Sequence, residues 1–301
     1  MYKMLFGVKS LVFKPALVSV VIPTVRQTAL VERCLTSLKN HTVWPNLEVV
    51  LVDDGSSPEV QARLTEIAAA HGCQLILKPD NTGFAKTVNI GTQKARGAYL
   101  VLVNNDIIFI DRHWLRALVT EASRGRNGVV GARLLYPDRR IQHAGVYYLP
   151  EARCFDHLYR HKPGSFPPAL QTREVLAVTG ALMLVRRETW DKLGGMAEEF
   201  FVAYEDVDFC LRAWQNGWRV AYCGKSVAIH TEGATRGTTP QNKDGEWYRR
   251  ELEGWALFQA KWFGPGGEPI FPYRFRGRSQ RLTPPGVTGQ WFSCPTGYYA
   301  E

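Results

Sequence analysis

The first hundred residues alternate between short apolar runs and segments with helical spacing, and this alternation constrains the fold more than any other feature. Residues 17–23 (LVSVVIP) and 47–52 (LEVVLV) are rich in β-branched residues, which is typical of strands buried on both faces. Apolar residues recur at helical spacing in 29–40 and 58–71, and Gly72 follows at a C-cap position. This order predicts right-handed crossovers and a mainly parallel sheet with helices on both faces.

The pattern continues through a strand at 74–77, a loop and helix at 82–95, and a strand at 98–103 (AYLVLV). Polar or turn residues stand directly at the ends of three strands. These are Pro23-Thr24, Asp53-Asp54-Gly55 and Asn104-Asn105-Asp106. In open parallel sheets, ligands bind outside the carboxyl ends of the strands. The sequence therefore predicts a nucleotide pocket at this edge.

Two common nucleotide-binding classes are excluded by the loops. The first strand runs into IPTVRQ, which has no glycine, and no GxxxxGK[ST] motif occurs anywhere in the chain. A dinucleotide fold and a P-loop ATPase each need such a glycine-rich turn to approach the phosphates. The net charge of +9, with a pI near 9.3, favours an anionic partner but does not choose among nucleotides, nucleic acid and phospholipid surfaces.

The six cysteines form no CxxC pair, which argues against a zinc ribbon or a dense disulfide framework and predicts isolated thiols in a reducing cytoplasm. No stretch approaches the roughly 20 apolar residues of a membrane-spanning helix. The N-terminal segment 1–16 has a short apolar run with no cleavage site after it. We therefore expect a soluble protein.

The second half predicts shorter elements. Residues 133–173 contain seven basic residues against three acidic ones, and their Pro and Gly content predicts loops and short strands. The other elements expected are a strand at 175–185, helices at 187–193 and 206–216, strands at 218–222 and 226–230, and a Trp-rich amphipathic helix at 245–263. From 264 onward Pro, Gly and Arg dominate, which predicts an irregular basic tail.

Asn104 and Asp106 stand two residues apart where a buried strand emerges, so their side chains point the same way on extended backbone. A carboxylate and an amide oxygen so placed suit a divalent ion whose remaining ligands come from phosphates. A strand-end turn is the alternative interpretation, because Asn-Asn-Asp is also good turn chemistry.

Three acids, Glu205, Asp206 and Asp208, cluster at the start of a predicted helix. Helix capping and the helix dipole account for part of this cluster. Asp206 is the better candidate for a general base, since a carboxylate beside a sugar pocket accepts the proton of an attacking hydroxyl. His230 ends a predicted strand, and it gains meaning as a ligand only together with Asp106.

Seven ordered motifs together resemble the family 2 glycosyltransferases, which have the GT-A fold. They are VSVVIPT, VLVDDGSS, NTGFAKTVNIG, VLVNNDIIF, VTGALMLVRRETWDKLGG, FFVAYEDVDFCLRAWQNGWRV and VAIHTEGATRG. The likeness runs from about Val18 to Gly237 and is greatest to bacterial rhamnosyl-, galactofuranosyl- and related polysaccharide transferases. It implies a leader (1–16), a GT-A domain (17–240) with a nucleotide-sugar half (17–111) and an acceptor half (112–240), and a C-terminal extension (241–301).

By position, the resemblance implies a nucleotide-sugar pocket in which Asp54 accepts a hydrogen bond from the base. Its residues are Pro23, Thr24, Asp54, Gly83, Lys86, Asn105 and Arg236. Asn104 and Asp106 stand where the family's DxD motif binds a metal, Mn²⁺ or Mg²⁺, and His230 where several members supply a further ligand. Asn104 replaces an acid of that motif. Asp206 falls on the catalytic base, with Glu205 as its neighbour.

The resemblance implies an inverting glycosyltransferase of polysaccharide or glycoconjugate synthesis. Its donor is a UDP-, dTDP- or GDP-sugar, and its acceptor a glycan or a lipid-linked glycan. A nucleic acid acceptor stays open. The expected location is the cytoplasm, with peripheral association at the inner face of the membrane as an open alternative. Trp247, Trp255 and Trp262 lie near one helix face, and we expect them to pack on the catalytic domain rather than face a membrane.

Three alternatives remain. A nucleotidyltransferase of related fold also joins a nucleotide pocket to paired acids, but it has no use for the acidic helix start and usually has a basic, glycine-rich first loop. A retaining transferase needs no base at Asp206. A non-catalytic nucleotide- or anion-binding module would use the basic tail to bind nucleic acid or an anionic membrane.

Overall fold

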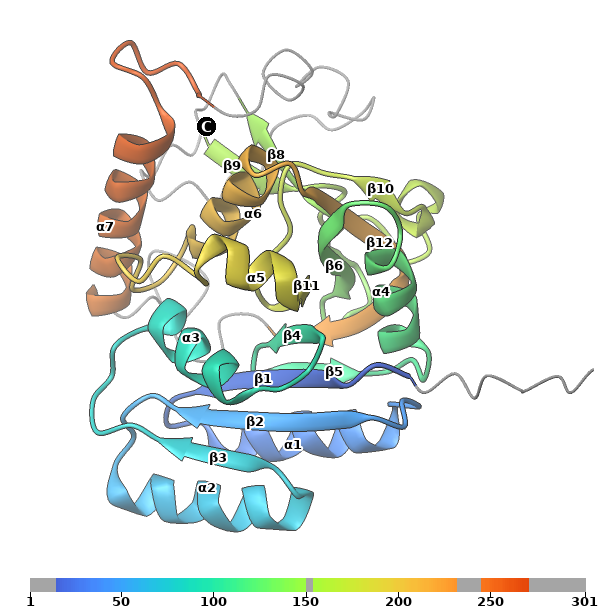
Figure 1. Ribbon diagram of the computed structural model, residues 1–301, viewed down its shortest axis with the longest axis vertical. Helices are drawn as coiled ribbons and strands as arrows, with labels where there is room; N and C mark the ends of the chain where they lie inside the picture. The colour runs from blue at the N-terminus through green and yellow to red at the C-terminus, as the bar shows by residue number, and fades with distance from the viewer. Residues whose placement is uncertain (1–14, 150–153, 232–244, 271–301) are drawn as a thin grey trace, which may run out of the picture.

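The computed structural model describes residues 15–149, 154–231 and 245–270, and in these residues a single large sheet organises the chain (Figure 1). Its strand order is β10-β12-β6-β11-β4-β1-β2-β3, with β5 also paired to β12 and β7 to β6. The strands are β1 Val18–Thr24, β2 Leu47–Asp53, β3 Gln74–Leu77, β4 Tyr99–Val103, β5 Ile107–Phe109, β6 Asn127–Leu135, β7 Ile141–His143, β10 Arg173–Glu174, β11 Leu182–Arg186 and β12 Arg219–His230. A separate hairpin pairs β8 Val146–Leu149 with β9 Cys154–His157.

The half of the sheet formed by β4, β1, β2 and β3 is parallel throughout, as the sequence predicts. Alternate residues of β1 face opposite sides of the sheet: Val20 and Ile22 belong to one apolar core, and Val21 to the other. A strand of this kind has no solvent face, which is why its sequence is a continuous apolar run.

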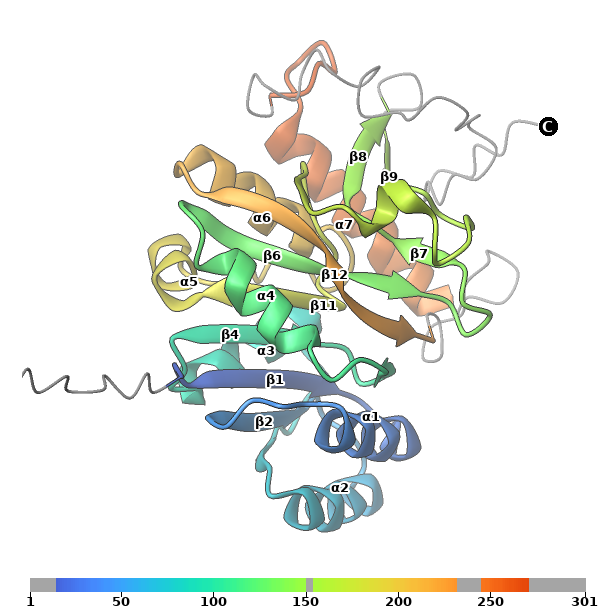
Figure 2. The same ribbon diagram turned by 90° about the vertical axis from the view of Figure 1, so that its right-hand side faces the viewer.

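Helices cover both faces of the sheet. They are α1 Thr28–Asn40, α2 Pro58–His71, α3 Phe84–Lys94, α4 Trp114–Ala122, α5 Arg187–Leu193, α6 Glu205–Gln215 and α7 Gly245–Trp262, and a short 3-10 turn spans Pro167–Leu170. Buried residues of α1, α2 and α4 share one core, and those of α3, α6 and α7 share the other. In Figure 2, α4 lies in front of the sheet and α7 behind it. Gly72 ends α2 with φ of 66°, the left-handed cap that the sequence predicts.

The other half of the sheet is mixed. β11 is antiparallel to both β4 and β6, and β12 is parallel to β6. β1, β2, β4, β6 and β12 therefore all point the same way, and their carboxyl ends lie at one edge of the sheet. β5 and β11 run in the opposite direction and begin at that edge.

Two strand predictions differ from the structure. The predicted strands 218–222 and 226–230 are one strand, β12, whose register shifts between Cys223 and Val227 absorb the intervening residues. The predicted strand 175–185 is shorter, because β11 begins only at Leu182. Residues 175–181 are apolar because nearly all of them are buried as a connecting segment, so burial produced the pattern without a strand.

The helix α7 packs on the domain through aromatic residues. Of the three tryptophans predicted to pack there, Trp255 and Trp262 are buried and Trp247 is half-buried. The carboxylate of Asp208, fully buried, accepts hydrogen bonds from Trp262 Nε1 at 2.9 Å and Arg212 Nε at 2.7 Å. Lys261 Nζ lies 2.8 Å from the same carboxylate. Asp208 thus anchors α7, and its place in the acidic cluster is structural.

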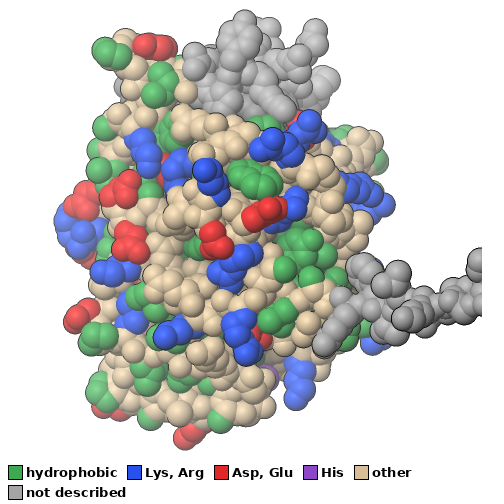
Figure 3. Space-filling model, viewed as in Figure 1, with side chains coloured by type: hydrophobic (Ala, Val, Ile, Leu, Met, Phe, Trp, Pro, Cys, Tyr) green, Lys and Arg blue, Asp and Glu red, His purple; other side chains and the backbone are tan. Residues whose placement is uncertain are grey.

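The outer surface of α7 is charged. Arg249 and Arg250 each form ion pairs with Glu246 and Glu253 there. Figure 3 shows Lys and Arg side chains interspersed with Asp and Glu over the face that includes α7, not gathered into one basic patch. In the described part of the chain, no helix is both long and apolar enough to cross a bilayer. The predicted boundary at 240, Arg236 and the tail beyond residue 270 lie outside the described residues.

Two histidines, the buried His143 and the half-buried His157, join β7 to the β8–β9 hairpin. The Nδ1 atoms of His143 and His157 are 2.7 Å apart, so one ring donates a hydrogen bond to the other. Burial lowers the pKa of His143 to about 3 and lowers the pKa of His157 well below its usual value. Both rings are therefore neutral in the folded protein at neutral pH.

The neutral histidine pair predicts acid destabilisation. Their pKa values are lower in the folded chain than in the unfolded chain, so the unfolded chain binds more protons as the pH falls below about 6.5. Each such histidine removes about 1.4 kcal/mol of stability per pH unit in that range. Urea unfolding measured between about pH 7 and pH 5 should show a shallower pH dependence in His157→Gln than in the wild type. His113→Gln, at an exposed position, is the control, and a slope in His157→Gln equal to that of the wild type would contradict this account.

Candidate active site

The parallel register brings the predicted polar residues together at one edge of the sheet. Thr24 pairs with Asp53 at the ends of β1 and β2, and the amide N–H of Asp54 donates to the carbonyl of Thr24 at 2.8 Å. Asn105, just after β4, donates from Nδ2 to Thr24 Oγ1 at 2.8 Å. Pro23 is buried within β1. The predicted pocket residues at the ends of β1, β2 and β4 are therefore neighbours. Their contacts with a nucleotide stay a prediction.

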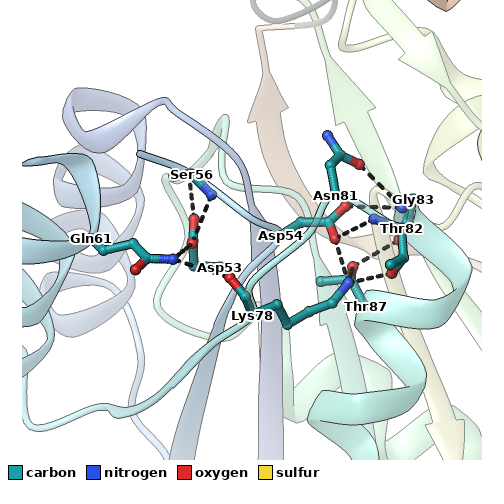
Figure 4. Close-up of polar contacts among 9 residues, drawn as sticks. All are labelled: Asp53, Asp54, Ser56, Gln61, Lys78, Asn81, Thr82, Gly83 and Thr87. Atoms are coloured by element: carbon teal, nitrogen blue, oxygen red, sulfur yellow. Dashed lines mark hydrogen bonds and ion pairs between the residues drawn. The ribbon is translucent and has the colours of Figure 1, made fainter. Parts of the chain in front are cut away.

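Asp54 lies at the centre of a buried polar network (Figure 4). Its carboxylate accepts hydrogen bonds from the backbone N–H of Thr82 at 2.9 Å and of Gly83 at 3.1 Å, and it forms an ion pair with Lys78. Lys78 also donates to the hydroxyls of Thr82 and Thr87. Asp54 is 6% exposed and Lys78 7%, so the two charges are neutralised by each other and by these bonds.

Through this network Asp54 has a structural role that no sequence motif indicated. Its carboxylate holds the loop between β3 and α3, so any bond to a nucleobase would be an additional one. Lys78 carried no motif signal, because a single lysine after a short strand is ordinary surface composition. Its role depends on a contact with a residue 24 positions earlier in the chain.

Asp53 holds the turn that follows β2. Its carboxylate accepts from the backbone N–H of Ser56 and from Gln61 Nε2, each at 3.0 Å, and from the Ser56 hydroxyl. Gly55 has φ of 75°, and a Cβ there would lie 2.4 Å from the backbone nitrogen of Asn81. The turn therefore needs glycine, both for its left-handed backbone and for the close approach of the next loop.

Gly83 brings the loop before α3 against the segment that precedes α6. Its φ is 90°, and a Cβ at this position would lie 2.4 Å from the carbonyl oxygen of Phe201. That carbonyl accepts a hydrogen bond from the backbone N–H of Phe84 at 2.9 Å. Lys86 lies exposed in the first turn of α3.

Asp206 stands in the first turn of α6 and is held by two backbone donors. Its Oδ2 accepts from Gly180 N–H at 2.8 Å, and its Oδ1 from Val207 N–H at 2.7 Å. Ala203 and Tyr204 turn the chain into the helix with left-handed φ values of 68° and 67°, which costs about 1 kcal/mol or more for each. The half-buried Asp206 is thus oriented, while Glu205 beside it is buried.

The segment before β11 links Asp206 to the polar motif after β4. Gly180 donates to Asp206, and the next residue, Ala181, accepts a hydrogen bond from the backbone N–H of Asn104 at 2.9 Å. Backbone atoms of two consecutive residues therefore contact Asp206 and the backbone of Asn104. The side chains named for proton transfer and for metal binding lie at the same edge of the sheet.

The side chains of Asn104, Asp106 and His230 lie close together, and their role as metal ligands stays a prediction. His230 Nε2 lies 3.1 Å from Asp106 Oδ1 and 3.5 Å from Asn104 Nδ2. His230 Nδ1 is 2.7 Å from Gln142 Oε1, a contact that no sequence motif indicated. His230 reaches this position because β12 ends beside β5, where it pairs with Ile107.

These residues fit a divalent ion. Asn104 Oδ1 is buried with no hydrogen-bond partner among the described residues, as expected for an amide oxygen placed to bind a cation. With metal–ligand bonds of about 2.1 Å, two ligands at right angles lie about 3 Å apart, close to the separation of His230 Nε2 and Asp106 Oδ1. In the described ranges no group of three or more His, Cys, Asp and Glu side chains forms a metal cage. A metal here would therefore take further ligands from a phosphate-bearing substrate.

Comparisons with known proteins agree with this fold. The glycosyl transferase family 2 model matches residues 19–194. Among solved structures, the chain resembles the mannosyltransferase PcManGT of Pyrobaculum calidifontis, in complex with GDP-Man and Mn²⁺, with a TM-score of 0.62, 19% identity, and coverage of 88% of this chain and 68% of that one. At that identity the likeness concerns the fold, which is the GT-A glycosyltransferase fold.

The chain belongs to glycosyl transferase family 2. It is 32% identical to the O-antigen biosynthesis protein RfbC of Myxococcus xanthus over 84% of this chain, but spans only 20% of that relative. It is 26% identical to the N-acetylglucosaminyl-diphospho-decaprenol L-rhamnosyltransferase of Mycobacterium tuberculosis, over 69% of this chain and 74% of that one.

The buried Lys78–Asp54 pair predicts a large loss of stability in Lys78→Met, because the carboxylate of Asp54 would remain buried without its counter-charge. We expect a loss of about 3–5 kcal/mol in the free energy of unfolding, measured by urea titration. Lys86→Met, at an exposed lysine of the neighbouring helix, should change stability by less than about 0.5 kcal/mol. Equal stability of the two variants would show that the pair contributes nothing.

Proposed function

We propose that this chain is an inverting glycosyltransferase that moves a sugar from a nucleotide-diphosphate sugar to an acceptor hydroxyl. The observation that supports the proposal is the pair of backbone hydrogen bonds made by the consecutive residues Gly180 and Ala181, one to the Asp206 carboxylate and one to the backbone of Asn104. Proton removal and leaving-group stabilisation are then available at one edge of the sheet. A nucleotidyltransferase has no use for an oriented carboxylate at Asp206.

In the proposed reaction, Asp206 accepts the proton of the acceptor hydroxyl. The acceptor oxygen bonds to the anomeric carbon as the bond from that carbon to the diphosphate breaks, which inverts the configuration. The N–H groups of Gly180 and Val207 keep the carboxylate in one orientation during this step. General-base help of this kind contributes about 10²–10⁴-fold in rate.

Asn104, Asp106 and His230 would hold the divalent ion, Mn²⁺ or Mg²⁺. Bound there, such an ion neutralises the negative charge that develops on the departing nucleoside diphosphate. Thr24, Asn105 and the loop at Gly83 would bind the nucleotide on the other side, and the half of the domain after residue 112 would bind the acceptor. Because Asn104 stands where the family's DxD motif has an acid, the protein would offer the ion one negative charge fewer.

The comparisons support the substrate class. The relative from Myxococcus xanthus is named for O-antigen biosynthesis, the one from Mycobacterium tuberculosis for transfer of rhamnose to a lipid-linked diphosphate sugar, and the similar structure contains GDP-Man with Mn²⁺. We therefore propose a UDP-, dTDP- or GDP-sugar as donor and a glycan or lipid-linked glycan as acceptor, in polysaccharide or glycoconjugate synthesis.

A panel of nucleotide sugars, each with Mn²⁺ and with Mg²⁺, tests the proposal through the release of nucleoside diphosphate. We expect release with one donor above all others and its acceleration by an acceptor glycan. A chain that binds nucleotide sugars but releases no diphosphate from any of them would instead be a binding module. Release of pyrophosphate from a nucleoside triphosphate and a sugar phosphate would favour the nucleotidyltransferase.

Asp206→Asn should nearly abolish transfer, because an amide does not accept the proton of the hydroxyl. Binding of the donor nucleoside diphosphate, measured by calorimetry, should change little, since the amide keeps the shape of the side chain. Asp191→Asn neutralises an exposed acid on α5 and should transfer sugar at the wild-type rate. If Asp206→Asn loses nucleotide affinity instead, the residue binds the donor and is not the base.

Asp106→Ala should remove the metal dependence of nucleotide binding. In the wild type we expect nucleoside diphosphate to bind more tightly with Mn²⁺ or Mg²⁺ than with EDTA, and in Asp106→Ala the two affinities should become equal. Calorimetric titrations under both conditions give this comparison directly. Wild-type affinity that EDTA does not change would remove the metal from the mechanism.

A further inference from the structure

Gln142 lies outside the seven sequence motifs and contacts His230, one of the candidate metal ligands. Gln142 stands on β7, is 2% exposed, and places its Oε1 atom 2.7 Å from Nδ1 of His230. The two residues are 88 positions apart in the chain. We propose that Gln142 is a positioning residue that holds the His230 ring with Nε2 toward Asp106 and thereby sets the affinity of this site for a divalent cation. The inference rests on the metal assignment in the proposed function.

A histidine binds a metal through the lone pair of an unprotonated ring nitrogen, and the hydrogen bond made by the other nitrogen decides which one that is. The amide oxygen of Gln142 accepts a hydrogen bond, so the nitrogen facing it, Nδ1, carries the proton. In the neutral ring the lone pair is then on Nε2, which is the atom 3.1 Å from Asp106 Oδ1. Partners of this kind orient metal-binding histidines, and their loss typically costs 10–100-fold in metal affinity.

The surroundings of β7 hold Gln142 in this position. The residues before and after Gln142 both pair with β6. Ile141 pairs with Leu135 and His143 with Leu134, and the register shifts between these two pairs. Ile141 and His143 are fully buried, so the backbone of β7 is held by packing as well as by pairing. His143 bonds with His157 and is neutral, and thus it adds no charge behind the site. Gln142 therefore presents a neutral acceptor from a rigid strand, which orients the imidazole without competing for the cation.

Two substitutions at this position separate the hydrogen bond from the packing. Gln142→Met keeps the length of the side chain but removes the acceptor, whereas Gln142→Glu keeps an acceptor oxygen facing Nδ1. Binding of Mn²⁺ is measured by the electron paramagnetic resonance signal of the free ion, first alone and then with UDP or GDP. We expect Mn²⁺ affinity to fall about 10–100-fold in Gln142→Met and to stay within about threefold of the wild type in Gln142→Glu.

Nucleotide binding in EDTA is the matched control, because a general distortion of the pocket would weaken it as well. We expect it to be the same in all three proteins. Equal Mn²⁺ affinity in wild type and Gln142→Met would overturn the proposal, and so would equal losses in the two variants. Wild-type protein that transfers sugar but binds no Mn²⁺ would overturn it while leaving sugar transfer intact.

A measurement on the wild type does not depend on how well the two Gln142 variants fold. Nitrogen NMR of the chain labelled at its histidines reports which ring nitrogen of each is protonated, and His230→Gln identifies the signal of residue 230. We expect Nδ1 of His230 to carry a proton in the metal-free protein. An unprotonated Nδ1 would mean that Gln142 does not orient the ring as proposed.

Discussion

The backbone of two consecutive residues, Gly180 and Ala181, connects the candidate catalytic groups. One peptide N–H orients the carboxylate of Asp206, and the next carbonyl holds the chain at Asn104. Both bonds exist because β11 begins at the edge where β4 ends, which requires it to run antiparallel to β4. The mixed half of the sheet is therefore what brings Asp206 to the end of the parallel half.

Two buried aspartates, Asp54 and Asp208, are paired with cations from other parts of the chain. Asp54 pairs with Lys78, and Asp208 pairs with Lys261 as well as with Arg212 of its own helix. A buried ion pair adds little net stability over an apolar pair, but removal of one partner is costly, so these pairs select one arrangement of the loops. Asp54 thereby holds the loop before α3, and Asp208 holds α7, on either side of the candidate site.

The candidate metal site differs from these pairs because the protein alone does not complete it. It offers one carboxylate, one imidazole and one amide oxygen, and the amide oxygen has no hydrogen-bond partner among the described residues. Such a site needs oxygens from a substrate to complete an ion's coordination. At such a site metal binding and nucleotide binding would depend on each other, and the proposed orientation of His230 by Gln142 would matter more than in a closed cage.

The sequence by itself determined the parallel half of the sheet, its helices and the grouping of Thr24, Asp54 and Asn104 at strand ends, because strand periodicity and helix spacing are local. Only the tertiary structure decided that β12 is one strand and that β11 is short. It also decided the contacts of Lys78, Gly180 and Gln142. Apolar residues 175–181 show why: burial alone produced a strand-like pattern there. Gln142 and His230 meet across 88 residues, and no local pattern encodes such a contact.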